Sequence, residues 1–166
     1  MLGIADFGAT DPALGYGPTV SIDMEYLGTL EVQLDPPQMV GQRMIFNTTG
    51  GTIKGPKIRG TIVDPSGDWL MPMPDGSLRL DVRATIKTAE GEFILMEYNG
   101  VIVVSKEATE RLSKDEEVTY RDAYFLTAPR FTTTSKTYDW LNKTQAIGKM
   151  VSMGVKNLKY DIFAVR

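Results

Sequence analysis

Apolar and polar side chains alternate along most of the chain, which is the pattern of half-buried β-strands. In the segment 25–34, Tyr26, Leu30, Val32 and Leu34 fall on one face, and charged or polar residues fall on the other. The segment ends at "DPP", where two prolines cannot continue a strand. We therefore predict a strand that ends at this proline pair.

The segment 78–87 has the most regular alternation in the chain. The turn signals "DPSGD" and "PMPDG" precede it, so we expect turns at residues 64–68 and 72–76. The segment 93–104 is apolar on both faces and predicts a central strand that is covered on both sides. One face of the strand 78–87 carries only apolar residues, namely Leu78, Leu80, Val82, Ala84 and Ile86.

A short helix is predicted from a Ser105 N-cap to about Leu112, followed by the strand-like segment 123–134 and a terminal hairpin near residues 144–165. Roughly nine strands and one helix indicate an all-β fold, either a sandwich or a barrel. We divide the chain into an N-terminal arm, residues 1–22, and one β-domain, residues 23–166.

The composition excludes several classes of function. The formal charge is −3 at pH 7 and Lys and Arg do not cluster, so we expect no nucleic-acid partner. No apolar run reaches the roughly 18 residues of a membrane helix and no basic leader is present, so we expect a cytoplasmic protein without a membrane partner. The chain has no cysteine and no histidine, which removes the common zinc ligands and the commonest general base. We therefore expect no metal and no cofactor. The partner is expected to be a small molecule, and exposed strand faces permit a homodimer.

The glycines of "NTTGGTIKGPKIRG", residues 47–60, are spaced like those of a phosphate-binding loop. That loop needs Lys and then Ser or Thr after its second glycine, and this chain has Pro56 and Lys57 there. Proline has no backbone N–H to offer a phosphate, which argues against nucleotide binding. Within strands, such glycines mark bulges, tight bends or close approach of two backbones.

Six blocks occur in order along the chain: "TGGTIKGPKIRGTIV", "DW", "PDGSLRLDVRATIKT", "GEFILMEYNG", "YFLTAPRF" and "YDWLN". In these blocks, residues 26–165 resemble the domain-of-unknown-function 3237 family, also called UPF0311. The resemblance implies a single antiparallel β-barrel, lipocalin-like in shape, of about eight to ten strands. It also implies that some similar proteins serve natural-product pathways as cofactor-free cyclases or isomerases of phenolic or polyketide intermediates.

Polar residues that interrupt apolar strands are candidates for a site in the barrel, because burying them costs free energy unless they find partners. Asp81 and Arg83 share one face of the strand 78–87, which is either a solvated outer face or a pocket wall. Glu97 and Asn99 share a face of the next strand, and the guanidinium of Arg130 can bind a carboxylate or an oxyanion. The candidate catalytic residues are Asp81, Glu97, Tyr98 and Arg130, and the candidate substrate-binding residues are Lys54, Trp69, Arg83, Asn99, Phe125, Tyr138, Trp140 and Asn142.

Two hypotheses from different classes follow. In the first, the protein is a cofactor-independent cyclase, isomerase or hydratase of a phenolic or polyketide-like molecule. Asp81 or Glu97 is its general base, and Tyr98 or Lys54 supplies the acid. Arg130 or Arg83 stabilises the developing enolate or phenolate. In the second, the barrel is a carrier without chemistry, with tryptophans lining the pocket and an arginine fixing the polar end of the ligand.

Overall fold

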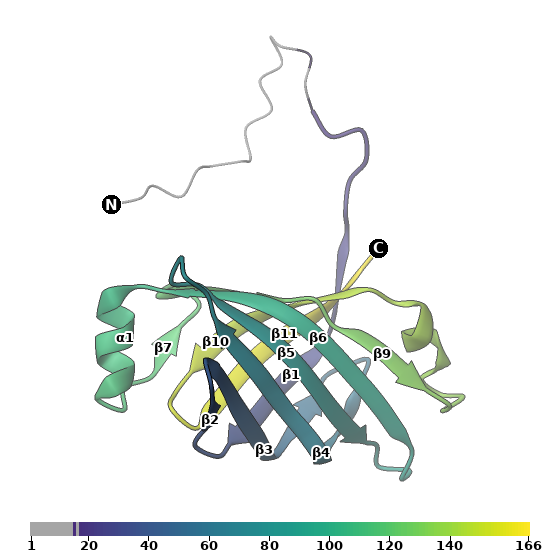
Figure 1. Ribbon diagram of the computed structural model, residues 1–166. Helices are drawn as coiled ribbons and strands as arrows, with labels where there is room; N and C mark the ends of the chain where they lie inside the picture. Colours follow the sequence, from purple (N-terminus) through teal and green to yellow (C-terminus); the bar gives the residue numbers. More distant parts are fainter. Residues whose placement is uncertain (1–14, 16) are drawn as a thin grey trace.

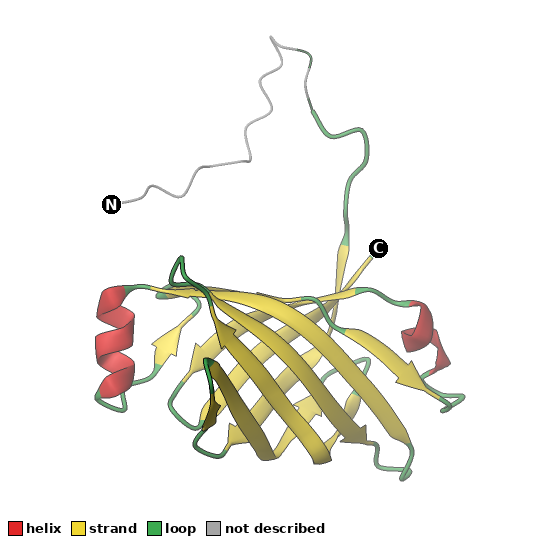
Figure 2. Ribbon diagram, viewed as in Figure 1, coloured by secondary structure: helices red, strands yellow, loops and turns green. Residues whose placement is uncertain are grey.

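The alternating segments form antiparallel strands in the computed structural model, which describes residue 15 and residues 17–166 (Figure 2). Two short helices accompany the strands, α1 (Lys106–Ser113) and the 3-10 helix η1 (Asp139–Lys143). The strands are β1 (Met24–Leu34), β2 (Gln38–Val40), β3 (Arg43–Lys54), β4 (Arg59–Pro72), β5 (Leu78–Lys87), β6 (Phe93–Val104), β7 (Val118–Thr119), β8 (Ala123–Thr127), β9 (Arg130–Thr133), β10 (Ala146–Met153) and β11 (Asn157–Val165).

The sheet closes on itself as a barrel (Figure 1). Its wall runs in the order β1, β11, β10, β8, β6, β5, β4 and β3, and β3 pairs again with β1. The short strands β2, β7 and β9 extend the wall by pairing with β3, β10 and β6. The predicted all-β antiparallel barrel is therefore confirmed, with eight strands in the closed wall.

Glycines allow the backbones to approach closely where the barrel closes. Gly51 pairs with Val32 across the β1–β3 seam, and its φ of +153° is one that side chains rarely allow. Gly55 follows β3, and a Cβ atom there would collide with the backbone of Leu27 and Gly28. These glycines thus serve close backbone approach, one of the three roles expected from the sequence.

Alternation along the strands fills the barrel with apolar side chains. On β5, Leu80, Val82, Ala84 and Ile86 are buried as the pattern predicted, and full burial of a Leu, Val or Ile side chain contributes roughly 1.5–3 kcal/mol. The remaining fully buried large side chains include Leu27, Leu30, Ile53, Ile58, Ile94, Met96, Leu141, Met150, Tyr160 and Ile162.

The two ends of the barrel are covered differently (Figure 1). At one end η1 inserts the fully buried Leu141. Asn142 ties this helix to β9, because its side-chain oxygen accepts from the Thr133 N–H at 2.8 Å and its side-chain nitrogen donates to the Thr133 carbonyl at 2.9 Å. At the other end α1 begins at its predicted Ser105 cap, which accepts from the Ala108 N–H at 3.1 Å.

Four local predictions were wrong. The central strand β6 is covered on its inner face only, because Phe93 and Val103 on its outer face are 56% and 48% exposed. The ladder between β1 and β11 shifts at Tyr26, so Tyr26 lies outside and Leu27 is buried in its place. The segment "DPSGD" is no turn, because β4 continues through it with an irregular register against β5. The segment 123–134 forms two strands, β8 and β9, which are interrupted at Pro129. The strand β8 pairs with the second half of β6, and β9 pairs with its first half.

Most of the predicted N-terminal arm, residues 1–14 and 16, lies outside the described residues. Residues 17–22 are exposed and form no strand, and the chain joins the barrel where the Asp23 and Arg166 backbones bond to each other. In the part of the chain that the structure describes, no helix is long and apolar enough to cross a membrane.

Candidate functional site

A cavity of about 360 Å³ opens at the end of the barrel that α1 covers. Its walls come from the inward faces of the strands, and Thr109 and Leu112 of α1 lie at its rim. Apolar side chains dominate the walls, which suits a small aromatic or polyketide-like molecule. The strand residues of the lining include Leu34, Met44, Phe46, Asp68, Leu70, Leu78, Leu80, Ile102, Phe125 and Leu158.

Asp68 brings a carboxyl group into this apolar cavity. It follows the irregular stretch of β4, shares the inward face with Leu70, and is only 8% exposed. Its Oδ1 accepts a hydrogen bond of 3.1 Å from the backbone N–H of Asp81 on β5. Of the charged side chains that the structure describes, Asp68 alone is buried. Ionising the Asp68 carboxyl group in this apolar environment costs free energy, so the group holds its proton more tightly than it would in water.

Burial raises the pKa of the Asp68 carboxyl from its ordinary 3.8 to about 7. The negative charge of Asp81 adds to this rise in pKa, and the hydrogen bond from the Asp81 backbone opposes it. A carboxyl group with a pKa near 7 is populated in both protonation states at neutral pH. It can therefore both give and take a proton, which is what a general acid–base catalyst requires.

Three aromatic rings pack against one another in the barrel core, and Phe125 among them also lines the cavity. Tyr160 on β11 meets Phe125 edge-on at 5.3 Å between ring centroids, and it meets Tyr98 at 6.3 Å. Tyr98 lies in the same cross-strand row as Asp68, with Val82 of β5 between them. Burial raises the pKa of Tyr98, and the charge of Asp68 adds to this rise. Burial also raises the pKa of Tyr160, with a smaller contribution from the charge of Tyr98. Both phenols therefore keep their protons at neutral pH and can donate hydrogen bonds.

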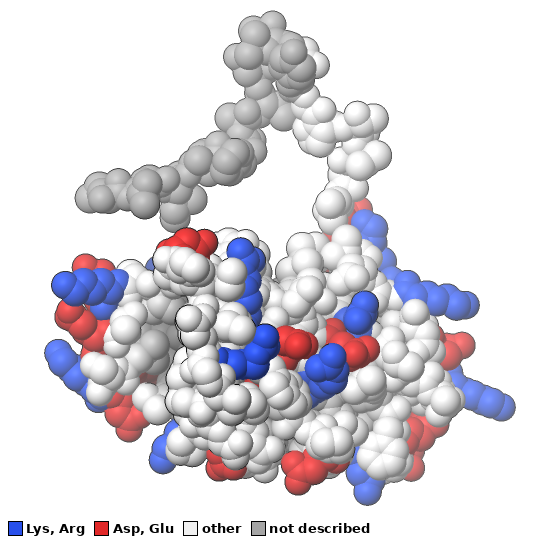
Figure 3. All heavy atoms as spheres, in the orientation of Figure 1, with Lys and Arg blue, Asp and Glu red and all other residues white. Residues whose placement is uncertain are grey.

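The predicted carboxylates and arginines come together, but outside the barrel. Asp81, Arg83, Glu97 and Arg130 project from the outer faces of β5, β6 and β9, where Figure 3 shows mixed charges at the centre of the visible face. Arg83 lies 3.4 Å from Asp81 and 3.7 Å from Glu97, and Arg130 lies 3.9 Å from Glu97. Asn99 shares this face and is exposed. These residues therefore do not line the apolar cavity, because the inward positions of these strands alternate with theirs and carry the core; they border a separate pocket on the outer surface instead.

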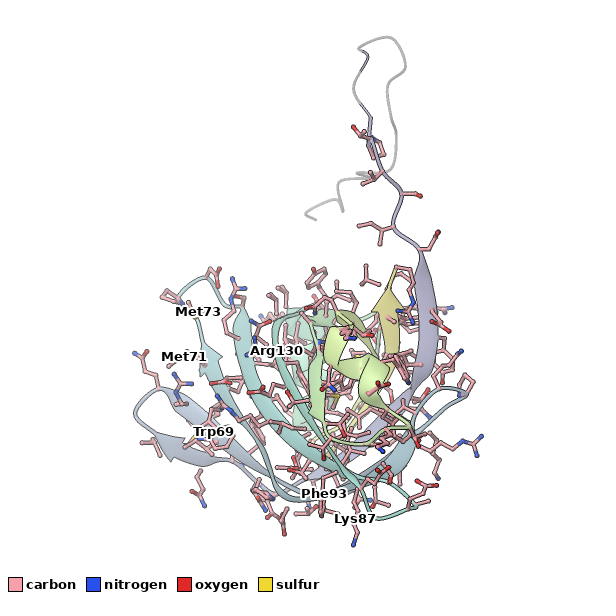
Figure 4. All side chains as sticks on the ribbon, turned by 90° about the vertical axis from the view of Figure 1, so that its right-hand side faces the viewer. Trp69, Met71, Met73, Lys87, Phe93 and Arg130 are labelled. Atoms are coloured by element: carbon pink, nitrogen blue, oxygen red, sulfur yellow. The ribbon has the colours of Figure 1, made fainter. Side chains whose placement is uncertain are left out.

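Of the other candidates, Phe125 is buried in the cavity wall, whereas Tyr98 is buried in the core and borders the pocket of the outer charged residues. Lys54 is exposed at the end of β3, and Trp69 projects from the outside of β4, in line with Met71 and Met73 (Figure 4). The three candidates near η1 lie at the opposite end of the barrel from the cavity: Tyr138 and Trp140 pack against the core there, and Asn142 holds η1 to β9.

The sequence reasoning missed Asp68 as a site residue and did not single out Tyr160, which packs against Phe125 and Tyr98 in the core. Asp68 was assigned to a turn, although it stands two residues before Leu70 and so shares its inward face. Tyr160 falls within the alternation of the last strand, where it reads as one more core aromatic. Among the described residues, no group of three or more His, Cys, Asp or Glu side chains could hold a metal ion.

The fold and the cavity define a class: closed antiparallel β-barrels with a largely apolar interior cavity and a buried carboxyl group in its wall. Within it, the chain belongs to the DUF3237 family, described as a protein of unknown function, whose family model matches residues 22–165. The family expected from the sequence blocks is thereby confirmed.

Comparison with individual proteins agrees with this assignment. The chain is 28% identical over 126 residues to a UPF0311 protein of Clostridium acetobutylicum, covering 72% of this chain and 80% of the relative. It is 29% identical over 154 residues to a hydroalkoxylation enzyme of Penicillium herquei, covering 89% of this chain and 85% of that enzyme. A solved β-barrel-like protein of Acinetobacter baumannii superposes with a TM-score of 0.75 at 29% identity, covering 91% of this chain and 99% of the other.

Proposed function

We propose that this protein is an enzyme that transfers protons within a phenolic or polyketide-like molecule bound in the barrel. The reaction is the addition of a hydroxyl group across a conjugated double bond, which closes a ring. Such an addition rearranges protons and one pair of π electrons and changes no oxidation state overall, so the protein's own acid–base groups are sufficient for it.

The observation that carries the proposal is the buried Asp68 in the wall of an apolar cavity, with a pKa of about 7. Perturbed carboxyl groups in clefts are found more often at functional sites than elsewhere. Buried carboxyl groups also cost stability, so a protein that keeps one without a charged partner has a use for it. Asp68 therefore takes the role that the sequence hypothesis gave to Asp81 or Glu97.

The proton movements balance around this one carboxyl group. The Asp68 carboxylate takes the proton of the ligand hydroxyl, and the oxygen attacks the β carbon of the double bond. The π electrons move onto the conjugated carbonyl as an enolate. The α carbon then takes the proton back from Asp68, which restores the carboxylate. The product is an isomer of the substrate.

The relative from Penicillium herquei supports this class of reaction, because it is described as a hydroalkoxylation enzyme and matches over most of both chains. A carrier without chemistry needs the same cavity but gains nothing from Asp68. Turnover therefore separates the two hypotheses.

The test uses 2′-hydroxychalcone, a phenol with a conjugated double bond that cyclises to flavanone with loss of its long-wavelength absorbance. Wild-type protein should accelerate this cyclisation above the buffer rate, and Asp68→Asn should lower the catalysed rate by about 100-fold or more. Asp81→Asn is the matched control, because it removes an exposed carboxyl from the neighbouring strand. Chalcone binding should survive in Asp68→Asn. Equal rates for wild type and Asp68→Asn, or a wild type that binds chalcone without turnover, would contradict the proposal.

A further inference from the structure

Apolar side chains cover one part of the outer barrel wall, over the second half of β6 and over β8, β10 and β11. This outer apolar face consists of Val101 and Val103 of β6, Tyr124 and Leu126 of β8, Ile147 of β10 and Phe163 of β11. Cross-strand pairing places these residues side by side. None of the six is buried, and Tyr124 is 55% exposed. Contiguous exposed apolar patches of this kind mark interaction surfaces.

The sequence of β6 points to the same face. The strand is apolar on both faces, which is typical of strands covered on both sides, yet the core covers only its inner face. The outer side chains Val101 and Val103 stay exposed or half-exposed. The middle of β6 instead presents the polar Glu97 and Asn99 outward, which suits a solvated surface. A second body on the outer apolar face would cover the end of β6.

Two opposite charges stand in the middle of this face. Lys149 of β10 and Asp161 of β11 are direct cross-strand neighbours, but no ion pair joins them in the part of the chain that the structure describes. The Lys149 Nζ lies 5.7 Å from the centroid of the Tyr120 ring, and Asp161 accepts a hydrogen bond of 2.6 Å from the Thr29 hydroxyl. A face with one positive and one negative charge is complementary to a copy of itself, whereas a face of a single sign repels its copy.

The face also has both a hollow and a protruding ring. The hollow has a volume of about 230 Å³, and its lining includes Tyr120, Lys149, Asp161 and Phe163. Tyr124 projects from β8, which pairs with β10 beside the hollow. Its ring is apolar and its hydroxyl can donate a hydrogen bond to a carboxylate such as that of Asp161. In a two-fold interface each contact occurs twice, so the ring of each protomer can enter the hollow of the other.

We propose that two copies of this protein bind each other through the outer apolar face, about a two-fold axis. In this dimer Lys149 pairs with the partner's Asp161, and Tyr124 enters the partner's hollow. The end of β6 is then covered on both sides, as its sequence indicates. The dimer is independent of the proposed function, because the cavity opens at the end of the barrel and the outer apolar face lies on its wall.

Sedimentation velocity at about 50 μM measures dimer formation by wild type, Lys149→Asp, Asp161→Lys and an equimolar mixture of the two variants. Wild type should sediment as a dimer. Each variant alone should dimerise at least about 10-fold more weakly, because its interface would hold two pairs of like charges. The mixture should recover the dimer. In a mixed pair one contact carries both substitutions and the other carries none, so both contacts join opposite charges.

Lys87→Asp is the matched control. It reverses an exposed charge at the end of β5, opposite Phe93 and away from the outer apolar face (Figure 4), and it should dimerise as wild type does. Thermal unfolding of each variant checks folding, because Asp161 also binds Thr29 within the chain. If Asp161→Lys does not fold, Tyr124→Glu takes its place, and it should be monomeric because it puts a charge where an apolar ring enters the hollow.

The outcomes that would overturn the proposal are distinct. A monomeric wild type would overturn the dimer, and full dimerisation of Lys149→Asp or Tyr124→Glu would show that another face is used. A mixture that stays monomeric, with both charge-reversal variants folded, would overturn the pairing of Lys149 with the partner's Asp161.

Discussion

Replacing Asp68 by Asn should stabilise the protein above neutral pH, although it removes the proposed catalytic group. Asn keeps the shape of the side chain and an oxygen that can accept the hydrogen bond from the Asp81 N–H. It cannot ionise. The difference in stability between the two proteins therefore isolates the cost of the buried carboxyl group.

The magnitude follows from the raised pKa of Asp68. In the unfolded chain this carboxyl titrates near pH 4, and in the folded protein its pKa is about 7. Between these values the folded state binds the proton and the unfolded state releases it, so wild-type stability falls as pH rises. The pKa difference of about 3 units corresponds to about 4 kcal/mol, which is an upper value for the gain in Asp68→Asn at pH 8.

Urea unfolding of wild type and Asp68→Asn at pH 4, 5, 6, 7 and 8 measures this gain, since the other titrating groups are common to both proteins. The advantage of Asn over Asp should be small at pH 4, should grow by up to about 1.4 kcal/mol per pH unit, and should level off above pH 7. Asp81→Asn should show a much smaller slope, because the charge of Asp81 is only the smallest of the causes that shift the pKa of Asp68. A difference that stays constant from pH 4 to pH 8 would refute the reasoning, because it would mean that burial does not raise the pKa of Asp68.

Three further predictions concern the seam, the rim and the outer face of the barrel. Gly55→Ala should destabilise the protein by about 2 kcal/mol or more in urea unfolding, because its Cβ atom would collide with the backbone of Leu27; unchanged stability would argue against this close contact. Leu112→Trp should fill the rim of the cavity and weaken chalcone binding about 10-fold by calorimetry with less than about 1 kcal/mol change in stability, whereas full affinity would place the ligand elsewhere. Arg130→Ala should change stability by less than about 0.5 kcal/mol and leave chalcone cyclisation intact, because this 73% exposed side chain pairs only loosely with Glu97. A loss of turnover would mean that the outer charged residues belong to the active site.

Much of the fold was predictable because it depends on local patterns. Alternation on β5, the Ser105 cap of α1 and the β10–β11 hairpin all follow from neighbouring residues, and the structure contains each of them. The errors occurred where a long-range contact overrides a local signal. The "DPSGD" segment has the residues of a turn, but pairing with β5 keeps it in a strand. The shifted register at Tyr26 likewise depends on its partner strand β11.

The candidate site was harder to predict, because alternation alone does not say which face of a strand points inward. Asp81 and Glu97 were candidate general bases of the cavity, but they pair with Arg83 and Arg130 on the outer surface. Asp68 was left in a supposed turn, although pairing of β4 with β5 places it on the inward face beside Leu70.

The sequence by itself determined an all-β fold and a chemistry without His or Cys, because strand periodicity and composition are properties of the chain alone; its motif blocks indicated the family, and the resemblance to that family implied the barrel. Only the tertiary structure decided which carboxyl group is buried. Closure of the barrel points the Asp68 side chain into the apolar interior, whereas the Asp81 side chain stays exposed to water. The loss of solvation raises the pKa of Asp68 to about 7. Two aspartates on adjacent strands thus differ in chemistry because of where the sheet closes.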